Sequence, residues 1–458
     1  MGELFLGLDL GTTKAAAVLA DGEGRVVASA SRPHGAELPA PADRAEQDPE
    51  TLLAAAWAAV RALPEEARCA ARGIGVTGQM HGVVLLDGRG DPLGPLVTWQ
   101  DRRTAGDPGF LLELVRRTGH PLRDGIGCVT LAWQQAREEL PAAAAVATGA
   151  AALAAGRLCG LARPPVDPTD AASWGLFDLR ALAWDLAALR AAGIPARLLP
   201  PVVPCGARIG ALTADLAAAL GLPAGIPVAA AIGDNQASLL ATLHDPAEEL
   251  ALTLGTGGQL SAVLAAGEAP PPATAESAWE LRPFPGGRLA LVAASPHGGA
   301  AWAALADAVR AWQVERGLTP PDRSALFDRL SELGLAATLE IAVRPRSGPD
   351  PYAAPLRAAL AGLEREDLAL GAVARGLARA ILVHLREVFP ALLREGRARL
   401  AGSGNALRRT PLLQQMAEEV LGLSLVLPAA EEEAAAGAAL LAARIPVDYD
   451  RAGRPAGP

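Results

Sequence analysis

The sequence predicts an α/β protein of two similar lobes, chiefly because one motif occurs twice along its 458 residues. The first copy, Leu6–Lys14, is an apolar segment that ends in a Gly-Thr-Thr turn. The second copy, Leu250–Gly258, ends in Gly-Thr-Gly. Two half-chains that each begin with the same hairpin indicate two similar lobes that face one nucleotide. Since two lobes of about 200 residues each fit this length, we expect a boundary near Asp245, with lobes 1–245 and 246–458.

The first hairpin has the residue types of a phosphate site. Leu4–Leu8 is apolar enough for a buried strand, and Gly11, Thr12 and Thr13 supply a turn with free amides and two hydroxyl groups. Such a turn forms a concave anion site. Asp9, at the strand end, is the kind of carboxylate that holds Mg²⁺ on phosphates, often through its waters. An ordinary hairpin turn is the alternative for an isolated Gly-Thr-Thr.

Lys14 is the only lysine among the 41 basic residues of the chain. A lone lysine in a chain of arginines indicates a place that needs a compact, flexible ammonium group rather than a planar guanidinium. Its position directly after the turn suggests a phosphate contact, although the side chain could equally point to solvent.

Polar clusters follow two apolar segments in the first half. Such strand ends are where α/β folds bind ligands. An aromatic face suits sugar stacking, and carboxylate and guanidinium groups suit hydroxyl groups, whereas packing in the core is the alternative for the Met-His pair. The cluster residues are Gln79, Met80 and His81 after the first segment and Trp99, Asp101 and Arg103 after the second.

Asp234 lies in a Gly-Asp-Asn turn that ends the apolar segment beginning at Val228. A carboxylate there is placed to take a proton from a substrate hydroxyl group while a phosphate waits opposite. A structural turn is the alternative. Near the other end of the chain, Gly402–Gly404 would let the backbone approach a flat ring or a ribose, and Gly437 would allow close helix approach.

Composition excludes several classes of function. The net charge of −9 and the pI near 5.3 come without a basic run, which argues against a nucleic-acid partner. No export signal precedes the first strand, and Pro141–Gly156 is better interpreted as a buried Ala-rich helix than as a membrane span. Four dispersed cysteines are expected to be reduced thiols in a cytoplasmic protein. Glu366–Phe389 and 411–421 are the clearest amphipathic helix candidates.

Taken in order, these segments resemble the FGGY family of carbohydrate kinases, which belongs with actin, hexokinase and Hsp70. The resemblance extends over essentially the whole chain. It is carried by the first hairpin, the Gln-Met-His-Gly segment at 79–82, Trp99 with Asp101 and Arg103, Gly233-Asp234-Asn235, Gly255-Thr256-Gly257 and Gly402-Ser403-Gly404.

The resemblance implies two RNase-H-like α/β lobes with mixed sheets around a central cleft. It implies ATP and Mg²⁺ as cofactors, a small ketose as substrate, and a monomer or homodimer. Asp234 would be the catalytic base and Asp9 the metal ligand. The sugar would contact Gln79, Met80, His81, Trp99, Asp101, Arg103, Asp170, Trp174 and Asn235. The nucleotide would contact Gly11, Thr12, Thr13, Lys14, Gly255, Thr256, Gly257, Gly402, Ser403, Gly404 and Asn405.

Two branches of the family compete for the substrate. Met80-His81 and Gly233-Asp234-Asn235 are similar to xylulokinases. Longer stretches are similar to sedoheptulokinases, which favours transfer of the γ-phosphate of ATP to the terminal hydroxyl group of sedoheptulose. These stretches are Leu96–Arg102, Gly125–Thr130, Asp170–Gly175, Arg288–Ser295 with His297–Gly299, and Gly402–Leu407. A pentulose kinase is the first alternative, and a non-catalytic actin-like nucleotide-binding protein is the alternative of another class.

Overall fold

The computed structural model describes residues 2–272, 278–338, 342–346, 357–361, 369–428 and 432–444. Contacts group the chain into two compact units. The first contains Met1–Ala241, the short stretch Arg282–Gly287 and the C-terminal helix α15 (Glu433–Ala443); the second contains Thr242–Leu281 and Arg288–Ala429. The lobes expected at 1–245 and 246–458 stay a prediction. The contact grouping differs from them in α15, which joins the first unit because it packs on that unit's sheet.

A mixed sheet forms the centre of the first unit, in the order β11-β12-β5-β1-β2-β3, with β13 beside β5. β1 runs parallel to β5 and antiparallel to β2. The side chains of Leu4, Leu6, Leu8 and Leu10 point to one face of strand β1, and all four are almost fully buried. The strands are β1 (Leu4–Leu10), β2 (Lys14–Asp21), β3 (Val26–Pro33), β5 (Ala71–Gly78), β11 (Arg208–Ala211), β12 (Pro227–Ala229) and β13 (Ile232–Gly233).

The second unit repeats this strand order. Its sheet runs β16-β17-β15-β14-β20-β21, so the first strand of the unit again lies between an antiparallel partner, β15, and a parallel partner, β20. The strands are β14 (Glu249–Leu254), β15 (Gly258–Val263), β16 (Trp279–Phe284), β17 (Arg288–Ser295), β20 (Arg399–Ser403) and β21 (Ser424–Val426). A separate hairpin pairs β18 (Ala342–Arg346) with β19 (Arg357–Ala361). The predicted fold class, two α/β units with mixed sheets, is confirmed.

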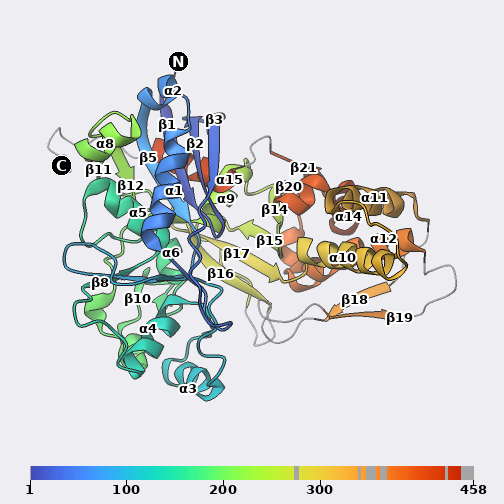
Figure 1. Ribbon diagram of the computed structural model, residues 1–458, viewed down its shortest axis with the longest axis horizontal. Helices are drawn as coiled ribbons and strands as arrows, with labels where there is room; N and C mark the ends of the chain where they lie inside the picture. The colour runs from blue at the N-terminus through green and yellow to red at the C-terminus, as the bar shows by residue number, and fades with distance from the viewer. Residues whose placement is uncertain are drawn as a thin grey trace. The chain divides into compact units, whose positions relative to one another are not determined.

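Helices and short strand pairs complete the first unit (Figure 1). Its helices are α1 (Pro49–Arg61), α2 (Glu65–Cys69), α3 (Pro108–Thr118), α4 (Gly127–Ala136), α5 (Ala150–Cys159), α6 (Pro168–Ala172), α7 (Leu186–Ala192), η1 (Ala196–Leu198), α8 (Ala214–Leu220) and α9 (Asp234–Thr242). The short pairs are β4 (Glu46–Gln47) with β7 (Leu96–Val97), β6 (Val84–Leu86) with β8 (Val146–Thr148), and β9 (Phe177–Asp178) with β10 (Ala183–Trp184).

Helices of the second unit pack around its own apolar core. They are α10 (Gly299–Glu315), α11 (Arg323–Ala336), α12 (Leu370–Val388), η3 (Ala391–Arg394), α13 (Asn405–Arg409) and α14 (Pro411–Leu421). The predicted helix at 411–421 is confirmed: Pro411 suits the first helical position and Gly422 ends the helix in a left-handed conformation. The helix predicted at Glu366–Phe389 is present as α12, and its first three residues lie outside the described residues.

The single Ala-rich helix predicted at Pro141–Gly156 is wrong in its first half. Val146–Thr148 forms strand β8, because its backbone pairs with β6, and helix α5 begins only after Gly149. Tertiary pairing has overridden the helix propensity of the alanines that precede it. No helix in the described ranges is long and apolar enough to cross a membrane.

Helix α15 lies directly on the backbone of the first sheet, beside the blue strands β1 and β2 in Figure 1. A Cβ atom added to Gly7 or Gly75 would lie 1.8 or 1.9 Å from a carbonyl oxygen of α15, and one added to Gly437 would lie 1.8 Å from the carbonyl oxygen of Ala237 in α9. Only glycine permits such approach. The close helix approach predicted at Gly437 is therefore present, and Glu432, the residue before α15, is near enough to Asp9 of β1 for their charges to interact.

Candidate active site

Three neighbouring strands of the first unit end at one edge of the sheet. β1 pairs in parallel with β5, with Asp9 opposite Thr77, and β13 pairs in parallel with β5, with Gly233 opposite Gly78. Asp9 therefore lies at the same edge of the sheet as Gln79 and Asp234, which directly follow the last residues of β5 and β13. Polar groups at the carboxyl ends of parallel strands are the usual ligand site of α/β sheets.

The turn after β1 is held by side chains from three other segments. The carbonyl oxygen of Thr12 accepts hydrogen bonds from Gln47 Nε2 at 2.9 Å and from His34 Nε2 at 2.8 Å. Trp99 Nε1 donates to Thr12 Oγ1 at 3.1 Å. The backbone N–H of Ala36 donates to His34 Nδ1, so in this arrangement Nδ1 is the acceptor and Nε2 the donor of the ring. These bonds fix the shape of the predicted phosphate turn.

Burial raises the pKa of three carboxyl groups around this edge. The pKa of Asp9 rises to about 7 through burial and the nearby charges of Asp234 and Glu432, against the opposing effect of Lys14. Burial raises the pKa of Asp234 to about 6, and burial with the charges of Asp167 and Asp234 raises the pKa of Asp170 to about 7. Carboxyl groups with raised pKa values in one place are typical of catalytic sites.

Lys14 forms an ion pair that the sequence did not indicate. Its Nζ lies 2.6 Å from Oε1 of Glu432, and the Lys14 side chain is 45% exposed while Glu432 is 17% exposed. The ammonium group of the one lysine is therefore paired with a carboxylate from the segment before α15. A phosphate contact of Lys14 stays a prediction.

The loop after β5, which is predicted to bind the sugar, is held by hydrogen bonds and by packing against neighbouring segments. Gln79 is buried, its backbone N–H donates to the carbonyl oxygen of Leu10, and its Nε2 donates to Gln47 Oε1 at 2.8 Å. Met80 is buried and packs on Gly233, where an added Cβ would lie 2.7 Å from Sδ. Gln47 thereby links this loop to the turn that holds Thr12.

His81 has a backbone φ of 74°, in the left-handed region. For a residue other than glycine this conformation costs about 1–2 kcal/mol. Ser173 holds it: Ser173 Oγ accepts from the His81 N–H at 3.0 Å, and the Ser173 carbonyl oxygen accepts from Nδ1 at 2.7 Å. Backbone strain of this kind is concentrated at functional sites.

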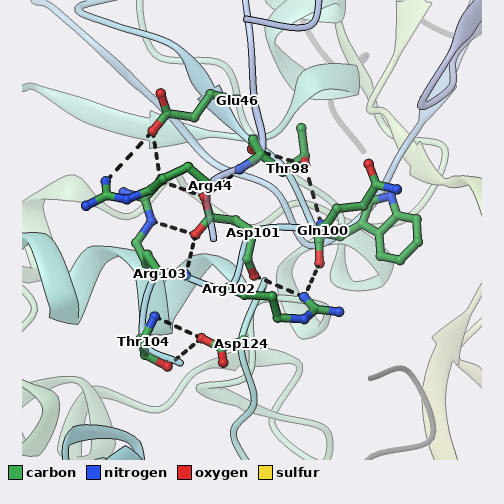
Figure 2. A network of polar contacts seen from close by, with 11 residues as sticks. Arg44, Glu46, Thr98, Gln100, Asp101, Arg102, Arg103, Thr104 and Asp124 are labelled. Atoms are coloured by element: carbon green, nitrogen blue, oxygen red, sulfur yellow. Dashed lines mark hydrogen bonds and ion pairs between the residues drawn. The ribbon is translucent and has the colours of Figure 1, made fainter. Parts of the chain in front are cut away.

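Asp101 and Arg103 bind each other in the structure (Figure 2). Arg103 Nε donates to Asp101 Oδ1 at 2.7 Å, Arg103 Nη2 also donates to Glu46 Oε1 at 3.0 Å, and Asp101 Oδ2 accepts from the Ala45 N–H. Both residues are almost fully buried. Their charges are therefore neutralised within a network that joins the segment around Glu46 to the loop carrying Trp99. Their predicted sugar contacts stay predictions.

Trp174 and Asp170, both predicted to contact the sugar, lie in and beside helix α6. The Trp174 side chain has no exposed surface, and it packs on Gly127 and against the ring of Trp184. In this arrangement it is a core residue. Asp170 is buried as well, and among the described residues its Oδ2 has no hydrogen-bond partner.

Asp234 begins helix α9, where the helix dipole favours a negative charge. Its Oδ1 accepts a hydrogen bond from the backbone N–H of Asn235 at 2.7 Å, and the charge of Arg282 opposes the rise of its pKa. The residue is only partly buried. A carboxyl group with a pKa near 6 is mostly ionised at neutral pH, so it can accept a proton.

In the second unit the repeated hairpin lies against the start of α10. The carbonyl oxygens of Gly255 and Thr256 accept from the N–H groups of Gly299 and Ala300, and the Gly255 amide is used by the Gly257 carbonyl oxygen. The amide of Gly255, one of those expected to bind phosphate, is therefore already occupied.

The predicted nucleotide residues at 402–405 end strand β20, which runs parallel to β14. Ser403 Oγ is hydrogen bonded to Thr253 Oγ1 at 2.8 Å. Gly404 has φ 88°, and a Cβ there would lie 2.4 Å from the Leu254 carbonyl oxygen. Asn405 begins α13. The structure thus brings Gly255–Gly257 and Gly402–Asn405 to the ends of adjacent strands, as in the first unit.

Four residues that contact the predicted site were not predicted from the sequence. Gln47, Thr169, Ser173 and Glu432 contact the predicted site from segments remote in sequence. Thr169 precedes the predicted Asp170 and Ser173 precedes the predicted Trp174, within or beside the stretch Asp170–Gly175, and this proximity is the signal that could have drawn attention to them.

Two α/β units of the same strand order, with acidic residues at the strand ends of the first, define an actin-like ATPase fold. The FGGY family of carbohydrate kinases, N-terminal domain, matches residues 4–241. Sedoheptulokinase of Homo sapiens is 31% identical, with 96% of this chain and 97% of the relative covered. Glycerol kinase of Thermus brockianus is also 31% identical, over 95% of this chain and 88% of the relative.

Xylulose kinase from Rhodospirillum rubrum has a similar structure, with a TM-score of 0.79, 26% identity, and coverage of 96% of this chain and 89% of that one. The chain belongs to the FGGY family of carbohydrate kinases, and the resemblance inferred from the motifs is confirmed. It is accordingly an ATP-dependent sugar kinase.

Proposed function

We propose that the protein transfers the γ-phosphate of ATP to the terminal hydroxyl group of a ketose, and that this ketose is sedoheptulose. The observation that carries the proposed chemistry is that Asp9 and Asp234 lie at the same sheet edge, at the ends of the two strands that flank β5, each with a raised pKa. The two carboxylates can have different roles because their environments differ. Asp9 can hold the metal ion on the phosphates, and Asp234 can accept the proton of the sugar hydroxyl group.

Asp234 acts as the base. The sugar O–H bond breaks as the oxygen bonds to the γ-phosphorus, the bond from that phosphorus to its bridging oxygen breaks, and ADP leaves. The proton passes to the Asp234 carboxylate. Because little covalent chemistry falls to the protein, most of the acceleration comes from position and charge.

The donor set near Asp9 fits a hard cation carried by phosphates. Asp9 Oδ1 is buried and has no hydrogen-bond partner among the described residues, and those residues include no cluster of three ligating side chains that could hold a metal ion. Mg²⁺ typically uses one or two protein carboxylates together with phosphate oxygens, so Asp9 would hold it. Such an ion supplies neutralisation of charge on the β- and γ-phosphates.

For other predicted residues we propose the following roles, which for Asp101 and Arg103 differ from the predicted sugar contact. Gln79, Met80, His81 and Trp99 bind the sugar directly. Asp101 and Arg103, which neutralise each other in a buried network, support the loop that carries Trp99. In the first unit the turn at Gly11–Thr13 is proposed to bind phosphate oxygens, and in the second unit the turn at Gly255–Gly257 is proposed to bind nucleotide.

Sedoheptulose is favoured by the extent of the similarity to the human enzyme, which covers nearly the full length of both chains. The glycerol kinase is as identical but is covered over less of its length. The likeness to a xylulose kinase structure supports a pentulose as the second candidate. We place the enzyme in the cytoplasm, in keeping with its four free cysteines.

The test is ADP release with Mg-ATP against sedoheptulose, D-xylulose, D-ribulose, L-ribulose and glycerol, with the Asp234→Asn protein as blank. Preference for sedoheptulose by at least tenfold in kcat/KM supports the proposal. Preference for a pentulose keeps the mechanism and overturns the sugar. An ATPase rate that no sugar accelerates would favour the non-catalytic nucleotide-binding alternative.

A further inference from the structure

Helix α6 and its two flanking residues, Asp167 and Ser173, form a short segment inside the first unit. Asp167 has no exposed surface and caps the helix: its Oδ1 accepts from the backbone N–H groups of Thr169 and Asp170, both at 3.0 Å. It also accepts from Thr169 Oγ1 at 2.6 Å. The hydroxyl proton of Thr169 is therefore directed at Asp167, which leaves the Thr169 oxygen as an acceptor.

The acceptor side of Thr169 faces the strand before Asp234. The backbone N–H of Gly233 donates to Thr169 Oγ1 at 2.8 Å. On the other side, Thr77 Oγ1 donates to the carbonyl oxygen of Ile232 at 2.7 Å. Thr77 and Thr169 are almost fully buried. The single peptide group between Ile232 and Gly233, just ahead of Asp234, is thus fixed at both ends, its C=O by Thr77 and its N–H by Thr169.

The other end of the segment holds the sugar loop. Ser173 accepts two hydrogen bonds from His81, one from its backbone N–H and one from Nδ1. These bonds maintain the left-handed backbone of His81. This short helix therefore holds the peptide before the predicted base at its first turn, through Thr169, and the predicted sugar loop just past its last residue, through Ser173.

We propose that Thr169 and Ser173 are positioning residues that set the place of Asp234 relative to the sugar loop. Neither needs to touch the substrate: Thr169 acts through the Gly233 peptide and Ser173 acts through His81. This inference rests on the proposed function, since it assigns Asp234 as the base. Thr169 affects mainly the rate of phosphoryl transfer, whereas Ser173 affects mainly the binding of the sugar.

The experiment measures kcat and the sugar KM for Thr169→Val, Thr169→Ser and Ser173→Ala with saturating Mg-ATP and the preferred ketose of the panel. Valine keeps the shape of threonine and removes the hydroxyl group, so the Gly233 N–H loses its acceptor. We expect kcat to fall about 10- to 100-fold, because small displacements of a catalytic group are costly, with the KM within about twofold. Thr169→Ser keeps the hydroxyl group and should stay within about threefold of the wild-type kcat.

Ser173→Ala should raise the sugar KM about 3- to 10-fold, because the His81 N–H loses its acceptor, and should change kcat less than about threefold. The matched control is Thr118→Val, since the Thr118 hydroxyl group bonds only near the end of α3: it donates to the Leu114 carbonyl oxygen four residues earlier and accepts from the His120 N–H two residues later. We expect no change in either constant there. Melting temperatures of all variants show whether they fold, and Thr169→Ala replaces Thr169→Val should the latter fail.

An equal loss of kcat in Thr169→Val and Thr169→Ser, or an unchanged kcat in Thr169→Val, would overturn the inference. The proposed function would still stand as long as the wild type is active. A wild-type protein that phosphorylates no ketose overturns both. If Thr169→Val and Ser173→Ala change KM and kcat in the same way, the proposed division of roles between Thr169 and Ser173 is contradicted.

Discussion

Replacing Asp234 by asparagine should abolish phosphoryl transfer and at the same time stabilise the ligand-free protein at alkaline pH. Asp234 has a folded-state pKa of about 6 against a usual 3.8, chiefly because burial disfavours its charge. A carboxyl group whose pKa is raised on folding stabilises the fold fully only below its unfolded pKa, and this contribution is lost as the pH rises through the folded pKa. The ionised Asp234 is therefore a cost to stability above about pH 6.

The size of the effect follows from the pKa. At about 1.4 kcal/mol per pKa unit, the rise from 3.8 to about 6 corresponds to about 3 kcal/mol at pH 8. At pH 5 the folded carboxyl group is mostly protonated, so we expect the gain from Asp234→Asn to be about half as large. Retention of the Asn235 hydrogen bond by the asparagine oxygen leaves the charge as the main difference between the two proteins.

The assay is urea unfolding at pH 8 and pH 5 in buffer containing EDTA, with wild type and Asp234→Asn side by side. The matched control is Asp178→Asn: Asp178 is exposed, and hydrogen bonds from the N–H groups of Ala181 and Arg180 lower its pKa. This control should not stabilise the protein at pH 8. A gain for Asp234→Asn that is absent at pH 8, or that is equal at both pH values, would refute the reasoning. Turnover above about a tenth of wild type would refute Asp234 as base.

Three further outcomes are expected. The kcat/KM of the wild type should fall below about pH 6 as Asp234 becomes protonated, and a flat pH profile down to pH 5 would contradict this. Gly437→Ala should destabilise the protein by about 1–3 kcal/mol in urea unfolding, since its Cβ would meet the Ala237 carbonyl oxygen, whereas Gly94→Ala, with open space around it, should have little effect. Lys14→Arg should raise the KM for ATP, because a planar guanidinium does not replace a compact ammonium; unchanged kinetics would mean that Lys14 does not serve the nucleotide.

The local sequence was sufficient to predict the two hairpins and the polar residues at the ends of the strands. Asp9 and the Gly-Thr-Thr turn are read from about ten consecutive residues, and the second copy at Leu250–Gly258 made the two similar sheets predictable. The helix at 411–421 carries its own start and stop signals in Pro411 and Gly422. By contrast, Val146–Thr148 became a strand only because β6 offers it a partner.

The sequence by itself determined the fold class, the family and the candidate base, because each is written in short motifs whose order along the chain is visible. Only the tertiary structure decided which polar groups meet. It paired Asp101 with Arg103 and Glu46, placed Trp174 in the core, and brought Glu432 to Lys14 and Thr169 to Gly233. These contacts depend on packing between distant segments, and no local propensity or spacing encodes which distant side chain will satisfy a buried donor or charge.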